Sequence, residues 1–167
     1  MTDLNIYEPE FDETPGREPR EGFMARRSYL GRRASATRLG ASLWHVAAGE
    51  AAYPYHFHLG EEELLVVVEG SGQLRTPAGW EPLERGAVLS FPTGEAGAHQ
   101  VVNDGSETLV FLAVSTAGAP DICVYPDAGK IGAFERGPNG SGVWEFYRRE
   151  DEAGYWSGVV PPAIEPR

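Results

Sequence analysis

Short apolar runs follow one another along residues 23–125, and glycine, proline, asparagine and aspartate separate them. No part of this stretch repeats its apolar residues at a helical spacing of about 3.6. The pattern predicts short strands at 26–34, 40–47, 52–58, 63–69, 72–76, 80–83, 87–91, 97–103, 108–115 and 121–125. Many short strands with frequent turns are typical of a sandwich or barrel, so we expect an all-β fold.

The turn signals support this division into strands. Glu69-Gly-Ser-Gly72 breaks one run with residues that accept turn dihedrals. Asn103-Asp-Gly-Ser106 contains an Asp-Gly pair, which is a hairpin signal. No part of the chain repeats the whole pattern, so we expect one barrel.

The two ends of the chain differ from this central block. Residues 1–22 are acidic with few apolar positions, and such a segment cannot form a core of its own. We therefore expect an acidic N-terminal arm at 1–22, a barrel at 23–130, and a C-terminal extension at 131–167 that packs on the barrel. Within the extension we expect a turn at 137–140, a strand at 143–147, a short helix or turn at 148–152 and an extended proline-containing tail at 159–167.

Charge and cysteine content narrow the range of partners and compartments. The formal net charge of −11 disfavours binding to nucleic acids and to anionic membranes. No 18-residue apolar run is present, and the acidic N-terminus lacks the apolar stretch of a signal peptide. The single cysteine, Cys123, excludes an intramolecular disulfide, which fits a reducing, cytoplasmic setting. We interpret Cys123 as a buried strand thiol.

Three of the four histidines belong to one constellation with metal-binding chemistry. His56 and His58 are two residues apart on a predicted strand, so their imidazoles share a face. Glu63 begins the next strand, and a buried carboxylate needs a cation or a proton. His99 can join them if the chain folds back as a barrel does. Three nitrogens and one oxygen suit Mn, Fe, Co, Ni or Zn.

At these residues the chain resembles the cupin superfamily. The first cupin motif is matched by Gly49, His56, His58, Glu63 and Gly70, and the second by Gly86, Pro92, Gly94, His99 and Asn103. Two loop spacings depart from the usual pattern: six residues separate Gly49 from His56, and four separate Gly94 from His99. Both departures precede the ligands. Residues 120–130 also resemble a group of single-domain cupins.

The resemblance carries several implications. It implies a double-stranded β-helix, or jelly-roll barrel, with an N-terminal arm and a C-terminal extension. It implies that His56, His58, Glu63 and His99 bind a divalent metal such as Fe, Mn, Ni or Zn. It also implies a homodimer, joined through sheet faces or swapped arms.

Two functions remain open at this point. The first is a metal-dependent enzyme of the oxygenase, isomerase or lyase type that acts on a small organic molecule. The second is a non-catalytic cupin that binds or senses a sugar or another small molecule. No acid or base outside the ligands is evident in the sequence, and therefore no catalytic residue is assigned.

Other residues are placed by strand alternation. Leu65 and Val67 should share the inner face with Glu63, while the apolar Leu64, Val66 and Val68 on the opposite face predict a cover from a second sheet or a partner subunit. Phe91, Val101 and Phe111 are candidate pocket lining. Glu61 and Glu62 are interpreted as a solvated acidic loop. No motif includes His45.

Overall fold

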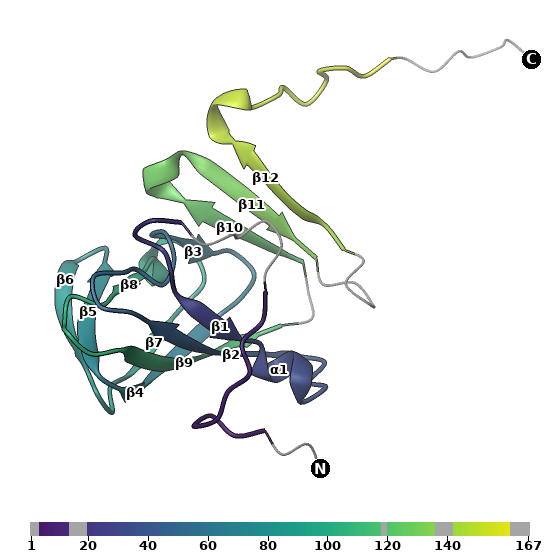
Figure 1. Cartoon of the computed structure of the whole chain (residues 1–167). Helices are drawn as coiled ribbons and strands as arrows, with labels where there is room; N and C mark the ends of the chain where they lie inside the picture. The colour runs from purple at the N-terminus through teal and green to yellow at the C-terminus, as the bar shows by residue number, and fades with distance from the viewer. Residues whose placement is uncertain (1–3, 14–19, 118–119, 136–141, 161–167) are drawn as a thin grey trace, which may run out of the picture.

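Antiparallel strands make up most of the regular structure in the computed structural model, which describes residues 4–13, 20–117, 120–135 and 142–160 (Figure 1). The strands are β1 (Arg26–Ser28), β2 (Leu39–Val46), β3 (Phe57–His58), β4 (Glu63–Glu69), β5 (Ser71–Thr76), β6 (Gly79–Glu84), β7 (Val88–Phe91), β8 (Gln100–Val102), β9 (Leu109–Thr116), β10 (Asp121–Tyr125), β11 (Lys130–Phe134) and β12 (Trp144–Arg148). The helical turns are α1 (Leu30–Arg33), η1 (Glu95–Gly97), η2 (Pro126–Ala128) and η4 (Arg149–Asp151). This confirms the all-β prediction.

The strands form three antiparallel sheets. Their orders are β1-β2-β9-β4-β7, β12-β11-β10-β3 and β6-β5-β8. Strands that are distant in sequence pair with each other, as β4 and β9 do, because the chain folds back to close the barrel. In Figure 1 the sheet of β10, β11 and β12 extends from the barrel, and the C-terminal segment runs away from it.

The barrel interior is apolar. Its core joins residues from several strands, and Phe111 is the largest of the fully buried side chains. The core consists of Trp44, Val46, Ala52, Tyr53, Leu65, Val67, Leu74, Leu83, Phe91, Val101, Leu109 and Phe111. These side chains pack against one another inside the barrel, so the barrel can fold around its own core.

Most strand predictions match the structure closely. The strands predicted at 40–47, 63–69, 72–76, 80–83, 87–91, 108–115 and 121–125 agree with it to within one residue at each end. Leu65 and Val67 are buried as predicted. Leu64 on the opposite face is 38% exposed, so no second sheet formed by the described residues covers it fully.

Three strand predictions are wrong in part. The strand predicted at 26–34 ends at Ser28, and Leu30–Arg33 form a helical turn instead. This turn packs against the backbone of β2, and the contact is possible because Gly31 has no side chain. The predicted strand 52–58 is reduced to Phe57–His58, and 97–103 to Gln100–Val102. Of the remaining residues, His56 and His99 pair only with each other in an isolated bridge, and bends or the turn η1 interrupt the rest.

The segments at the two ends attach differently. The backbone N–H of Asp12 donates to the carbonyl of Arg27, and Asp12 accepts from the N–H of Tyr29, which holds the described part of the N-terminal arm against β1. Strand β12 corresponds to the strand predicted at 143–147 and pairs with β11, a strand that was not predicted. The predicted turn at 137–140 and the tail from residue 161 lie outside the described residues. Among the described residues, no helix has the length and apolar character needed to cross a membrane.

Candidate metal centre

His56 and His99 face each other across an antiparallel bridge. The N–H of His56 donates to the carbonyl of His99 at 3.1 Å, and the N–H of His99 donates to the carbonyl of His56 at 2.9 Å. Directly opposed residues of an antiparallel pair have their side chains on one face. The two rings accordingly lie 4.8 Å apart, so the fold brings together histidines that are far apart in sequence.

His58 is placed by a second pairing. Strand β3 pairs with β10, and Cys123 lies directly opposite His58. The His58 ring is 5.0 Å from the ring of His56, as their spacing of two residues requires. His58 therefore reaches the same region from the adjacent wall of the barrel.

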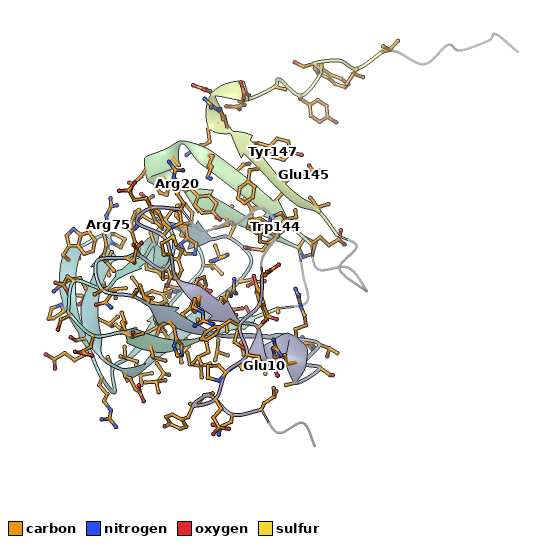
Figure 2. All side chains as sticks on the ribbon, viewed as in Figure 1. Glu10, Arg20, Arg75, Trp144, Glu145 and Tyr147 are labelled. Atoms are coloured by element: carbon orange, nitrogen blue, oxygen red, sulfur yellow. The ribbon has the colours of Figure 1, made fainter. Side chains whose placement is uncertain are left out.

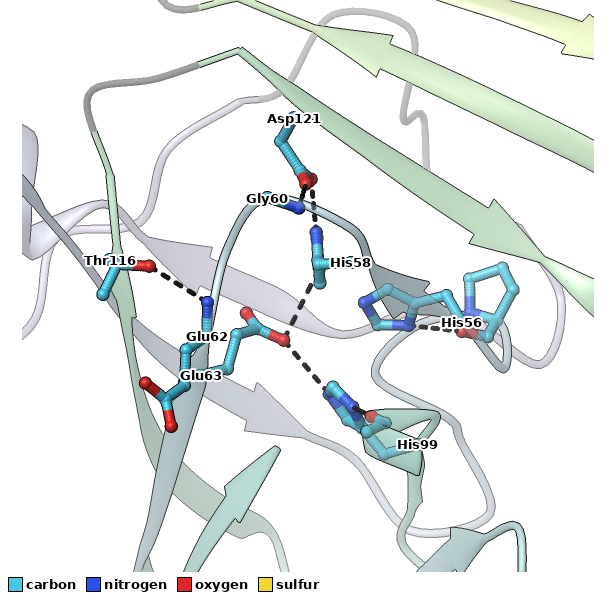
Figure 3. Close-up of polar contacts among 10 residues, drawn as sticks. His56, His58, Gly60, Glu62, Glu63, His99, Thr116 and Asp121 are labelled. Atoms are coloured by element: carbon cyan, nitrogen blue, oxygen red, sulfur yellow. Dashed lines mark hydrogen bonds and ion pairs between the residues drawn. The ribbon is translucent and has the colours of Figure 1, made fainter. Parts of the chain in front are cut away.

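Glu63 supplies a carboxylate between these rings (Figure 3). Its Oε2 lies 3.5 Å from Nε2 of His58 and 3.3 Å from Nε2 of His99. Strand β4 holds Glu63 between Phe91 and Ser115, and the Phe91 ring stacks on His99 at 3.8 Å. The side chain of Glu63 is 20% exposed, whereas that of His99 is 3% exposed, so the site opens to solvent on the Glu63 side.

Each of the three histidines has an oxygen partner at Nδ1. His56 contacts the carbonyl of Pro54 at 2.9 Å, and His99 contacts that of Gly97 at 2.9 Å. His58 contacts Oδ2 of Asp121 at 2.5 Å (Figure 3). A ring that donates from Nδ1 has its lone pair on Nε2, which is the arrangement of metal-binding histidines.

Burial and charge determine the protonation of these groups. Burial lowers the pKa of His99, although the Glu63 charge opposes this, so His99 is neutral near pH 7. Burial alone would also lower the pKa of His58, but the hydrogen bond to Asp121 and the charge of Glu63 more than offset it, and the pKa is raised. Burial alone would raise the pKa of Asp121; its bond to His58 and the N–H groups of Gly60 and Ile122 lower it instead.

This donor set fits a cation. Neutral His99 presents a lone pair at Nε2 to an oxygen of the Glu63 carboxylate, and two acceptors in contact need a positive charge between them. Ligand atoms of His56, Glu63 and His99 all lie within 4.8 Å of one another. Imidazole and carboxylate ligands suit a divalent transition metal.

The sequence did not predict that strand β10 borders the candidate site. Asp121, Cys123 and Tyr125 alternate along this strand and therefore share a face. Asp121 bonds His58, and the Tyr125 ring stacks at 5.8 Å on His56. The alternation was visible in the sequence, but the direction of the face was not.

The other predicted residues lie in different settings. Phe91, Val101 and Phe111 are buried in the core, and the Tyr53 ring meets His56 edge-on at 4.8 Å. His45 lies away from the site against Phe11 of the arm, and burial lowers its pKa. Glu62 is exposed as predicted, but the prediction for Glu61 is wrong: it is 7% exposed, because the turn after Gly60 is tied to the end of β9, where the N–H of Glu62 donates to Oγ1 of Thr116.

The motif residues that do not contact the site shape its loops. The Asn103 side chain is fully buried and donates to the carbonyls of Val46 and Glu107. Gly94 has a φ of 84° and begins the loop before His99. The extra residues of that loop form η1, which explains how a longer spacing still delivers His99 to the site.

Residues 42–115 match the family model of the cupin domain, and this segment carries all four proposed ligands. This segment also folds into a double-stranded β-helix, the barrel of that family. The chain therefore contains a cupin domain. Strands β10, β11 and β12 lie outside the matched segment, and Asp121 is the first residue of β10.

Several relatives of this cupin have names that include an activity. Over 70 residues it is 39% identical to a glucose-6-phosphate isomerase of Pyrococcus abyssi and 37% identical to one of Thermococcus onnurineus. Each match covers 39% of this chain, which spans 36% of the length of these relatives.

Solved structures extend the likeness over most of the chain. A candidate sugar phosphate isomerase from Acidithiobacillus ferrooxidans is 28% identical, with a TM-score of 0.68, and the match covers 84% of this chain and 83% of that one. A sugar phosphate isomerase from Silicibacter pomeroyi is 22% identical, with a TM-score of 0.75 and coverage of 89% and 93%. The second likeness concerns the fold alone.

Proposed function

We propose that this cupin binds a divalent transition metal through His56, His58, Glu63 and His99 and acts on a small organic molecule as a metal-dependent enzyme. The observation that carries the proposal is the common orientation of the three imidazoles. Each contacts an oxygen through Nδ1, and Nε2 of His58 and of His99 faces the Glu63 carboxylate. Core histidines without a ligand have no reason to share this arrangement.

The residues around this site would have different roles in the reaction. A divalent metal held there would polarise an oxygen of the substrate as a Lewis acid. His99 and Phe91 form the buried floor, while Glu63 and His58 lie at the solvent-accessible side where a small molecule can approach. Asp121 would hold the proton of His58 on Nδ1 and so leave Nε2 free to bind the metal.

Isomerisation is the reaction class that the comparisons favour among oxygenase, isomerase and lyase chemistry. The curated relatives carry the name glucose-6-phosphate isomerase, and the structure from Acidithiobacillus ferrooxidans is described as a candidate sugar phosphate isomerase. We therefore propose phosphorylated sugars as the first substrate class to test.

A non-catalytic binder is the second candidate. It is favoured because the carboxylates nearest the site already have partners. Asp121 bonds His58 and Gly60, and Glu63 lies between two histidines. An enzyme needs an acid or base that can move a proton of the substrate. If sugar phosphates raise the melting temperature of the metal-loaded protein without turnover, this second function replaces the first.

The test is the metal content of protein purified without a histidine tag. We expect about one metal ion per chain in the parent protein and its loss in His99→Ala. His45→Ala is the matched control, because His45 lies away from the site, and it should retain the metal. A parent that holds no metal and gains none on reconstitution contradicts the proposal.

Two further proposals concern the setting of the protein. We propose a homodimer, supported by the exposed aromatic side chains of β12 and by the exposed Leu64 on the outer face of β4. We also propose a cytoplasmic, reducing location, supported by a single cysteine that is buried beside the histidines.

A further inference from the structure

Strand β10 brings a thiol to the candidate metal centre. Cys123 lies directly opposite His58 in the antiparallel pairing of β10 with β3, so their side chains occupy the same face. Asp121 and Tyr125 precede and follow it on that face, and they contact His58 and His56. Cys123 is therefore enclosed among site residues on both sides along its strand.

The sulfur is within reach of the same ion as the imidazoles. Sγ of Cys123 and ring nitrogens of His56 and His58 all lie within 4.8 Å of one another. Donor atoms bound to one ion lie at most about 4.4 Å apart, given metal–nitrogen and metal–sulfur bonds of about 2.1 and 2.3 Å. The 4.8 Å limit on the three atoms is close to this reach.

The two sets of possible metal ligands have one histidine in common. His56 belongs to the cluster with Glu63 and His99 and also to the cluster with His58 and Cys123. The side chain of Cys123 is 1% exposed, so bulk solvent does not compete for the thiol. The orientation of the histidine rings points to a metal independently of the cysteine.

We propose that Cys123 supplies a thiolate ligand to the metal, on the His56 and His58 side of the centre. This inference rests on the proposed metal centre and adds a sulfur donor to it. On binding, the S–H bond is replaced by a metal–sulfur bond and the proton passes to solvent, so no oxidant or reductant is needed. A sulfur donor favours Zn, Co and Cd over Mn and Mg.

The test is a cobalt titration of the metal-free, full-length protein, kept reduced by a phosphine so that no added thiol can bind the cobalt. Visible d–d absorption reports that Co²⁺ binds, whereas a near-ultraviolet charge-transfer band reports a bond from thiolate to Co²⁺. Cys123 is the only cysteine of the chain, so any such band must come from it. The parent should show both signals, and Cys123→Ser should retain the visible bands and lose the charge-transfer band.

Relative metal affinities provide a second readout. Cys123→Ser should weaken Cd²⁺ binding by about tenfold or more and leave Mn²⁺ binding within about twofold, because the sulfur serves the softer ion. Equal losses for both ions would show a general disturbance of the site and overturn the inference.

The outcomes separate the two proposals. Visible bands without a charge-transfer band in the parent would remove Cys123 from the ligand set and leave the metal centre intact. An absence of all cobalt signals would overturn both proposals. The parent spectrum decides the question even if Cys123→Ser does not fold.

Discussion

The three histidines of the candidate centre differ in the acceptor at Nδ1. His56 and His99 contact backbone carbonyls, whereas His58 contacts the carboxylate of Asp121. A carboxylate partner makes the opposite nitrogen a stronger metal donor and fixes the ring. The same carboxylate raises the pKa of His58, so a proton competes with a metal more strongly here than at His99.

The substitution Asp121→Asn should therefore weaken metal binding at high pH by roughly 10- to 100-fold. Below its raised pKa, His58 must lose a proton before it binds a metal, so the parent's apparent affinity falls as the pH drops through that value. Removing the carboxylate lowers the pKa of His58, so this fall should move to lower pH. Chelator competition at several pH values measures both effects.

Asp127→Asn is the matched control for this substitution. Asp127 lies just beyond β10 and pairs with Arg75 at the surface, where its side chain is 54% exposed. It should keep the parent's affinity and pH profile. A parental profile in Asp121→Asn as well would remove Asp121 from any role in tuning His58.

At the scale of elements, a single helical turn delivers His99. Turn η1 absorbs the extra residues between Gly94 and His99, and Gly97 at its end accepts the Nδ1 contact of His99 through its carbonyl. A side chain at Gly97 would place Cβ 1.8 Å from the carbonyl oxygen of Pro92. Because that oxygen belongs to the backbone, the loop itself would have to move.

We expect Gly97→Ala to lower the free energy of unfolding by about 2 kcal/mol or more, because steric overlap with backbone is among the strongest single-residue effects. It should also weaken metal binding by displacing His99. Urea denaturation and cobalt titration measure the two losses.

Gly154→Ala provides the comparison for this substitution, since its Cβ would meet only Oγ of Ser157 at 3.4 Å. It should change the stability by no more than about 0.5 kcal/mol. Similar stability for Gly97→Ala and the parent would show that the loop relaxes without cost.

At the scale of the whole molecule, the sheet of β10, β11 and β12 leaves an aromatic surface beside the barrel. Phe134 stacks on Trp144 at 4.3 Å and meets Phe146 edge-on at 5.5 Å. Trp144 remains 47% exposed and Phe146 41% exposed, and Figure 2 shows Trp144 on the extending sheet. Clustered exposed aromatic residues are typical of an interface, which is why the homodimer is proposed to use this surface.

Trp144→Glu should therefore convert a dimer into a monomer in light scattering, because a charge would be buried in the contact. Trp80→Glu on β6 is the matched control: Trp80 is 57% exposed, yet lies on another sheet. It should leave the mass unchanged. A monomeric parent, or a dimer that survives Trp144→Glu, contradicts this use of β12.

The sequence by itself determined most of the strands, because alternation and turn residues are local signals. Alternation placed His56 and His58 on one face, and the resemblance to the cupin motifs added Glu63, His99 and the loop glycines. What alternation cannot show is which strand lies opposite which. Only the tertiary structure placed His56 against His99 and Cys123 against His58.

The same reason explains the residues that were missed or misjudged. Asp121 acquires its role only because β10 pairs with β3, and Glu61 is buried only because its turn meets the end of β9. Strand β11 has a weak local pattern and is stabilised by its two neighbours, β10 and β12. Local sequence gives the faces of each strand, while the pairing of distant strands decides which chemical groups meet.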